Sequence, residues 1–293
     1  MNKKKIANLA PYGYITPITV ILIGFVIVSV IISIVLSFTR YNIMTPPTFY
    51  GLKNYERLVT DTKFMKALFN TLKLMVMIVP LQMILSLIVS VFLVSHRHML
   101  IGKIANSVIF IPVLCSNAAT GVIWRELLNG KIPAVETFFG LFGIKASMLL
   151  GNAKTALAVV AAVAIWKMLG YYVVIYSSGL LGISESFYEA AKVDGANAIH
   201  RFFNVTIPML APAITICVVG ITTGSLKVYD LLVTSTKGGP GRASTSVIYK
   251  TYTTAINGRQ YGYGSAMTVT LVFALLLVAL IQVKGLRKKE VQA

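Results

Sequence analysis

A short run of small and charged residues, Tyr188-Glu189-Ala190-Ala191-Lys192-Val193-Asp194-Gly195-Ala196, lies between two apolar stretches. Ser184, Glu185 and Ser186 form a helix start before it and Gly195 a helix stop, which predicts a short amphipathic helix. Its alanines are small enough to let a partner backbone approach closely, while its carboxylates offer polar contacts. This combination indicates a docking surface. The candidate docking residues are Glu189, Ala190, Ala191, Asp194, Gly195 and Ala196.

Polar and aromatic residues also interrupt the apolar stretches 155–181 and 207–229. Polar groups inside membrane spans normally face a bundle interior or an aqueous cavity, so these residues are candidates for contact with a transported solute. The alternative is an interfacial position, where long side chains snorkel towards water. The preferred candidates are Tyr171, Tyr172, Ser225, Lys227 and Tyr229, with Trp166, Lys167, Thr222 and Thr223 as further ones.

Motifs for catalysis are missing from the sequence. It has no GxxxxGK[ST] phosphate-binding loop, no HExxH and no GxSxG, and its nine acidic residues are scattered. Cys115 and Cys217 suit buried apolar positions, and the three histidines lack the carboxylate or cysteine neighbours of a metal site. We therefore expect a non-enzymatic chain without a metal or cofactor of its own.

Composition places these candidates in a membrane. Hydrophobic residues make up 56% of 293 residues and charged residues only 12%, against about 25% in ordinary soluble domains. Mean hydropathy is +0.78. One span needs roughly 20 apolar residues, so the chain holds about six spans and leaves hardly any room for a separate globular domain.

The predicted fold is all-α and polytopic, a single transmembrane domain over residues 1–293. Uncharged apolar runs define the spans, and Pro112 lies inside the third while Pro208 and Pro212 open the fifth. The predicted spans are 14–38, 74–94, 104–124, 155–181, 207–229 and 264–283, and the docking segment lies in the loop 182–206.

Basic residues predict the orientation, although the net charge of +18 is spread over both sides. An even number of spans puts both termini on one side, and Lys3–Lys5 with Lys284 and 287–289 place that side in the cytoplasm. The outer segments hold at least as many basic residues. That excess is either membrane-surface charge or a means of attracting an acidic binding protein or an anionic solute.

The docking segment resembles the cytoplasmic signature of ABC importer permease subunits, which reads EAA, then a Gly, then Ile-x-Leu-Pro. Here the first half is Glu189–Ala196 and the second is Val205-Thr206-Ile207-Pro208, with Val in place of Ile and Ile in place of Leu. These are mild apolar departures. The spacing, the Asp-Gly pair and the position before the fifth span make the resemblance specific.

Three further elements resemble the carbohydrate-uptake branch of that family, the relatives of maltose and glycerol-phosphate permeases. They are its G-L-x-N-Y element, its GGP loop after the fifth span and its G-x-x-S-A opening of the last span. In this sequence they are Gly51–Tyr55, Lys227–Asp230 with Gly238–Gly241, and Gly262–Met267. Together with the docking segment they favour a sugar over an amino acid, a peptide or phosphate.

The resemblance implies a type I ABC importer permease in a bacterial cytoplasmic membrane. Its expected partners are a second, related permease, two ATPase subunits that bind ATP and Mg and engage the 182–206 loop, and an extracellular solute-binding protein. The expected cargo is a sugar or oligosaccharide, and no nucleic acid is involved. Glycerol phosphate or an anionic sugar is an alternative cargo. An autonomous secondary transporter or a membrane-embedded enzyme is the alternative of another class.

The spacing of Lys227 and Asp230 carries one further expectation. The two residues are three apart and share a helix face if the fifth span continues that far. They would then form an ion pair at the outer mouth of the transport pathway.

Overall fold

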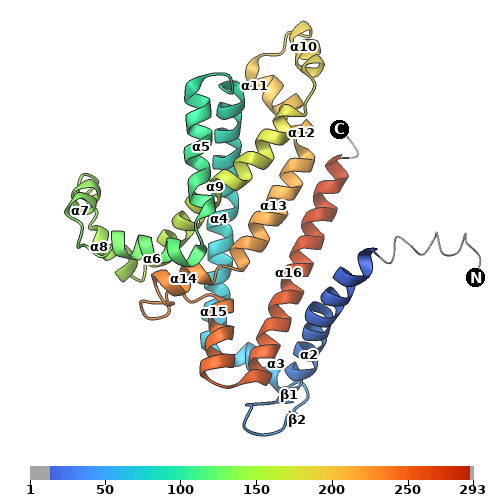
Figure 1. Ribbon diagram of the computed structural model, residues 1–293, viewed down its shortest axis with the longest axis vertical. Helices are drawn as coiled ribbons and strands as arrows, with labels where there is room; N and C mark the ends of the chain where they lie inside the picture. The colour runs from blue at the N-terminus through green and yellow to red at the C-terminus, as the bar shows by residue number, and fades with distance from the viewer. Residues whose placement is uncertain (1–13, 291–293) are drawn as a thin grey trace, which may run out of the picture. The chain divides into compact units, whose positions relative to one another are not determined.

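The described part of the chain is mostly helical (Figure 1) and divides into two compact units. The computed structural model describes residues 14–290, with side chains for residues 14–285. The first unit ends at Thr62 and resumes over Thr251–Val272, and the second comprises Lys63–Lys250 and continues from Phe273.

The first unit begins with a 24-residue apolar helix, Tyr14–Ser37, which has no buried residues in its most apolar window. Two short antiparallel strands follow, with Thr39 opposite Phe49. The elements of this unit are η1 (Leu22–Ile27), α2 (Val28–Ser37), β1 (Thr39–Arg40), β2 (Thr48–Phe49), α3 (Lys53–Thr60), η3 (Thr253–Asn257) and the beginning of α16 (Tyr261–Glu290).

The Gly51–Tyr55 element closes the end of the first apolar helix. The Asn54 amide donates to the carbonyls of Ser37 at 2.8 Å and Thr39 at 2.9 Å, and the Tyr55 hydroxyl lies 2.7 Å from that of Ser37. The last carbonyls of a helix have no partner within it. This motif supplies one from a following turn, in which Gly51 has a φ of +60°.

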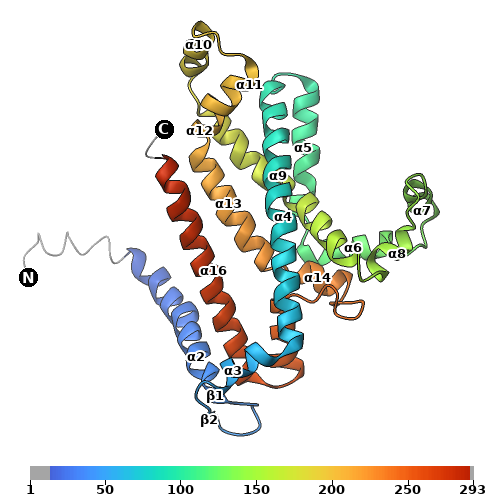
Figure 2. The same cartoon turned by 180° about the vertical axis from the view of Figure 1, so that it is seen from behind.

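The second unit holds most of the apolar helices and the candidate docking segment. α4 and α5 form a helical hairpin visible in Figures 1 and 2. The elements of this unit are α4 (Thr62–Ser95), α5 (Leu100–Leu114), α6 (Asn117–Leu127), α7 (Pro133–Gly140), α8 (Ala146–Gly151), α9 (Ala156–Leu181), α10 (Glu185–Val193), α11 (Ala198–Arg201), η2 (Phe202–Thr206), α12 (Ile207–Met209), α13 (Ala211–Leu226), α14 (Asp230–Ser235), α15 (Val247–Tyr252) and the end of α16.

The core of the second unit lies around α9, which packs against both α5 and α13. Leu74 and Ile78 of α4 join this core, with Tyr176 of α9 and Cys217 of α13. Fully burying such side chains contributes about 1.5–3 kcal/mol each where water is the alternative. Between lipid-embedded helices that drive is weak, so close packing holds this core together.

Two of the six predicted spans are not continuous helices. The third, predicted over 104–124, breaks between Leu114 and Asn117 with a bend of 101°. Cys115 is extended, and the Ser116 hydroxyl caps α6 by accepting from the Ala119 N–H at 3.1 Å. The apolar run continues through this break, and hydropathy alone therefore misses it.

The fifth span, predicted over 207–229, bends by 70° at Leu210 and ends at Leu226. Pro212 has no N–H to donate to the Pro208 carbonyl, which interrupts the helical ladder at the bend. A second break separates α13 from α14, because Tyr229 has φ −127° and ψ −66°. Lys227 follows the end of α13 and Asp230 begins α14, so the two residues do not share a helix.

The other four predicted spans correspond to continuous helices, Tyr14–Ser37, Thr62–Ser95, Ala156–Leu181 and Tyr261–Gly285, each long and apolar enough to cross a membrane. Counting each bent pair as one span gives six within residues 14–290. α4 begins twelve residues before the predicted start at 74. The lysines in this first part are exposed and do not stop the helix.

Buried side-chain amides and hydroxyls on α4 hold the segment Arg242–Val247, which follows the Gly238–Gly241 loop. The Asn70 amide donates to the carbonyls of Arg242 and Thr245, both at 3.1 Å, and the Thr71 hydroxyl accepts from the Val247 N–H at 2.9 Å. Asn70 and Thr71 are both buried. A loop without regular structure is thereby fixed to the longest helix of the second unit.

The packing of α5 against α9 can be tested by substitution. A methyl group at Gly170 would lie 2.5 Å from the Ile109 carbonyl oxygen and 3.0 Å from Phe110 Cα, so the backbones would have to separate. Gly170→Val is expected to destabilise the protein by about 1–3 kcal/mol, the usual effect of overpacking. A fall in the thermal midpoint of the detergent-solubilised protein measures it.

Gly24→Val is the matched control, since Gly24 also lies in an apolar helix but has open space around its Cα. An equal loss of stability in both variants would contradict the close approach of α5 and α9.

Candidate functional site

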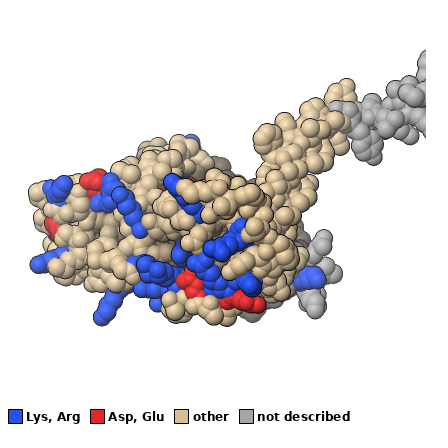
Figure 3. Space-filling model, turned by 90° about the horizontal axis from the view of Figure 1, so that it is seen from below, with Lys and Arg blue, Asp and Glu red and all other residues tan. Residues whose placement is uncertain are grey.

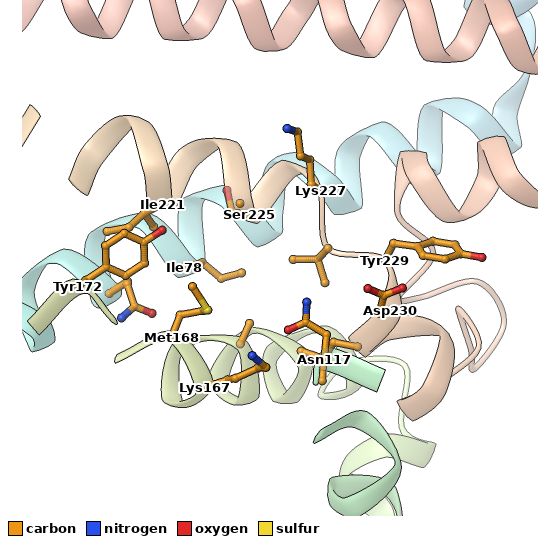
Figure 4. A pocket seen from close by; sticks show the side chains of 15 residues that line it. Ile78, Asn117, Lys167, Met168, Tyr172, Ile221, Ser225, Lys227, Tyr229 and Asp230 are labelled. Atoms are coloured by element: carbon orange, nitrogen blue, oxygen red, sulfur yellow. The ribbon is translucent and has the colours of Figure 1, made fainter. Parts of the chain in front are cut away.

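A cavity of about 250 Å³ lies in the second unit, lined by residues of α4, α9, α13, the start of α6 and the start of α14 (Figure 4). Apolar side chains such as Ile78, Met168 and Ile221 form part of its wall. The polar part of the lining consists of Gln82, Asn117, Lys167, Tyr172, Ser225, Lys227, Tyr229 and Asp230.

Four of the five preferred solute-contact candidates line this cavity. Tyr172 and Ser225 are buried, while Lys227 and Tyr229 are more open. In Figure 4 Lys167 and Asn117 point towards the space between α9 and α13, whereas Lys227 and Tyr229 extend away from it. Sequence reasoning therefore found the helices that form the cavity and several of its residues.

Tyr171 is not among the lining residues. It is 47% exposed and lies on another face of α9. Successive residues of a helix are separated by about 100°, so Tyr171 and its neighbour Tyr172 cannot both face the same cavity. Of the further candidates, Lys167 lines the cavity, while Trp166, Thr222 and Thr223 do not.

The expected ion pair between Lys227 and Asp230 is not formed. The break after α13 places the two residues on separate elements. Arg125, in contrast, forms an ion pair with Glu126 at 3.1 Å. The cavity thus carries charged groups that do not neutralise one another.

Sequence analysis missed Gln82 and Asn117 as lining residues. Gln82 lies within an otherwise apolar helix, which is the same signal that singled out polar residues in the fourth and fifth spans. Asn117 begins α6 directly after the break in the third span. The position of Asn117 at the cavity could not be predicted without knowing that the third span breaks there.

The chemistry of this lining is hydrogen bonding. The Ser225 hydroxyl donates to the Thr222 carbonyl at 2.8 Å and keeps its oxygen lone pairs for an acceptor role. Amide and phenol groups beside it donate and accept. Such groups match the hydroxyls of a polar solute, while the apolar wall suits the C–H faces of a ring.

A second candidate site is the segment around α10, at one end of the second unit (Figure 1). The Ser184 side chain caps α10, and Gly195 has a φ of +77° directly after the helix. The Tyr188 hydroxyl lies 3.0 Å from that of Thr206, linking α10 to η2. The predicted start and stop of this helix are confirmed.

The surface of this segment is open. None of the residues of α10 is buried, and Val193 is 88% exposed. Ala191, Asp194, Gly195 and Ala196 line a hollow of about 400 Å³ together with residues of α11 and η2. Glu189 and Ala190 are exposed nearby but do not line the hollow.

The described residues contain no group of three or more His, Cys, Asp or Glu side chains able to hold a metal ion. The continuous and bent apolar helices, the polar cavity among them and the open segment at one end define a multi-pass membrane protein. Comparison with known proteins identifies its family.

The chain belongs to the family of binding-protein-dependent transport system inner membrane components, which it matches over residues 62–283. The multiple sugar-binding transport system permease protein MsmF of Streptococcus mutans is 31% identical, over 87% of this chain and 87% of that protein. The probable starch degradation products transport system permease protein AmyD of Thermoanaerobacterium thermosulfurigenes is 28% identical, over 95% and 94%.

The fold is that of an ABC importer permease. A bacterial alginate ABC transporter, solved in complex with an alginate pentasaccharide-bound periplasmic protein, contains a chain of the same fold. The TM-score is 0.83 at 18% identity, with 98% of this chain and 97% of that chain covered.

The open segment gives a test of docking. Ala191→Trp adds bulk beside the hollow, and Gly195→Pro forbids the positive φ that the backbone adopts there. Both variants are expected to reach the membrane at normal level, since the residues lie outside the apolar helices. Co-purification of an ATPase with the membrane complex, or its stimulated hydrolysis, should fall at least about tenfold.

Two milder variants are the controls. Ala191→Ser keeps the side chain small, and Gly195→Asn tolerates a positive φ better than other residues do. Both should retain ATPase binding. Full activity of the variant that carries both Ala191→Trp and Gly195→Pro would rule this segment out as the docking element.

Proposed function

We propose that this chain is one membrane-spanning subunit of an ATP-driven importer and that its cargo is a sugar or oligosaccharide. The observation that carries the proposal is a polar cavity between apolar helices in a chain of the binding-protein-dependent transport family. Relatives with sugar-transport names, matched over nearly their whole length, support the choice of cargo.

The cavity chemistry agrees with that cargo. Tyr172, Ser225, Asn117 and Gln82 offer hydroxyl and amide groups, and sugars bear a hydrogen-bonding group on most ring carbons. At about 250 Å³ the cavity is slightly smaller than the usual ligand pockets of roughly 300–1,000 Å³. It suits one end of a cargo molecule or a single ring.

The assembly has further parts in this proposal. A second, related permease encloses the pathway, because a polar route through lipid needs helices on all sides. Two ATPase subunits, which bind ATP and Mg, engage the segment around α10. That segment then faces the cytoplasm. The basic residues that predict this orientation, Lys3–Lys5 and 287–289, lie outside the residues whose side chains are described.

An extracellular solute-binding protein delivers the cargo in this scheme. Exposed Arg40, Arg57 and Arg259 line one hollow of the first unit. Figure 3 shows Lys and Arg side chains spread over the face seen from below, with fewer acidic ones among them. Such a surface favours an acidic partner and raises its rate of association at low salt.

A second candidate cargo is glycerol phosphate or an anionic sugar carried by the same machinery. The two lysines of the cavity, Lys167 and Lys227, favour it. An autonomous secondary transporter is the remaining alternative and requires no ATPase.

Reconstitution separates these alternatives. The chain is co-expressed with its neighbouring permease, ATPase and binding-protein genes and placed in liposomes. We expect sugar uptake only when ATP and loaded binding protein are both present. Uptake by this chain alone, driven by an ion gradient, would establish the secondary transporter instead.

A pair of hydroxyl variants tests the cavity itself. Ser225→Ala removes a hydroxyl that lines the cavity, and Thr223→Val removes one that does not. Both hydroxyls donate to a carbonyl of their own helix, Ser225 to Thr222 and Thr223 to Val219 at 2.7 Å. Each variant therefore removes one side-chain hydrogen bond from α13.

Loss of one hydrogen bond to the cargo changes binding by about 1 kcal/mol, which is a factor of about five. We expect Ser225→Ala to slow uptake about fivefold at saturating binding protein and Thr223→Val to leave it unchanged. Equal rates for both variants and the original chain would remove Ser225 from the pathway.

A further inference from the structure

The cavity between α9 and α13 holds a buried cation without a partner. Lys167 is 6% exposed and lies near the middle of the apolar helix Ala156–Leu181. Its ammonium group makes no hydrogen bond or ion pair with any residue whose side chain the structure describes. Its Nζ is not among the fully buried polar atoms, so the ammonium group keeps access to the cavity that the side chain lines.

A second lining group is also unsatisfied. Gln82 is 1% exposed, and both polar atoms of its amide are buried without a hydrogen-bond partner. Buried polar groups of this kind are nearly always paired, and each exception calls for a ligand, a water or a function. Gln82 of α4 thus brings an unpaired amide to the same cavity that Lys167 of α9 lines.

The other charged lining groups do not satisfy Lys167. Asp230 is exposed and forms no ion pair with it, and Lys227 adds a charge of the same sign at the rim. Figure 4 shows Asp230 on the far side of Asn117 from Lys167, and Lys227 pointing away from both. The closed part of the cavity therefore presents a positive charge without an anion.

We infer that this cavity is a subsite for an anionic group of the cargo, a carboxylate or a phosphate. The inference rests on the proposed function and specifies its substrate class. Lys167 supplies the charge and three N–H donors, while the Gln82 amide nitrogen supplies two more. A neutral sugar satisfies the hydrogen bonds and leaves the charge unpaired, whereas an acidic sugar or a sugar phosphate satisfies both.

The test uses the whole purified complex in nanodiscs, without binding protein, so that the membrane site is measured by itself. The probes are galacturonate, glycerol phosphate and galactose, which separate the carboxylate, the phosphate and the neutral ring. We expect galacturonate or glycerol phosphate to bind at least about tenfold more tightly than galactose by calorimetric titration. The anion that binds more tightly shows whether the cargo carries a carboxylate or a phosphate.

Lys167→Met removes the charge and keeps an unbranched side chain. It should abolish the preference for the anion while leaving galactose binding within about twofold. Lys103→Met is the matched control, since it removes an exposed lysine of α5 that does not line the cavity, and it should change neither quantity.

Four results would overturn the inference. They are binding of galactose as tight as that of both anions, a persistent anion preference in Lys167→Met, an equal loss in both lysine variants, and absence of binding by all three probes. None of them disturbs the proposed importer, which depends on ATP-dependent uptake in liposomes. Failure of that uptake with every sugar is a separate outcome.

Discussion

Lipid offers no hydrogen-bond partner to an interrupted backbone, so every break in a span has to lie against protein or a polar cavity. The second unit contains two such breaks at the cavity wall, one between α5 and α6 and one between α13 and α14. Asn117 follows the first break, and the segment from Lys227 to Asp230 contains the second. The polar lining of the cavity and the irregular backbone therefore lie together, because both need hydrogen-bond partners that lipid does not offer.

Hydrogen bonds from side chains to main-chain carbonyls explain two of the short motifs. Asn54 ties the turn after the first apolar helix to that helix, and Asn70 ties the segment Arg242–Thr245, which follows the Gly238–Gly241 loop, to α4. Glu136 holds the start of α8 in the opposite sense, because its carboxylate accepts the Ala146 and Ser147 N–H groups. These bonds lower the pKa of Glu136 and favour its charged form.

The membrane class, the continuous spans and the short helix α10 were predictable from sequence because each leaves a local signal. Hydropathy marks a span, and a serine before with a glycine after marks a short helix such as α10. The breaks in the third and fifth spans were not predictable, since Cys115 and Tyr229 take non-helical conformations within apolar or mixed runs. The cavity residues Gln82 and Asn117 were also missed. Sequence analysis likewise did not separate Tyr171 from Tyr172, which lie on different faces of α9.

The bend at Leu210 has a mechanical consequence. α13 starts at this bend, close in sequence to the η2 segment that Tyr188 holds to α10, and it carries Ser225 near its other end. Sixteen residues of helix span about 24 Å. A tilt of about 5° at the bend would therefore displace the distant end by about 2 Å, comparable to the small helix shifts that switch other proteins between two packed states. If α13 tilts as a rigid helix about the bend at Leu210, a small movement of the open segment reaches the cavity without any unfolding of α13.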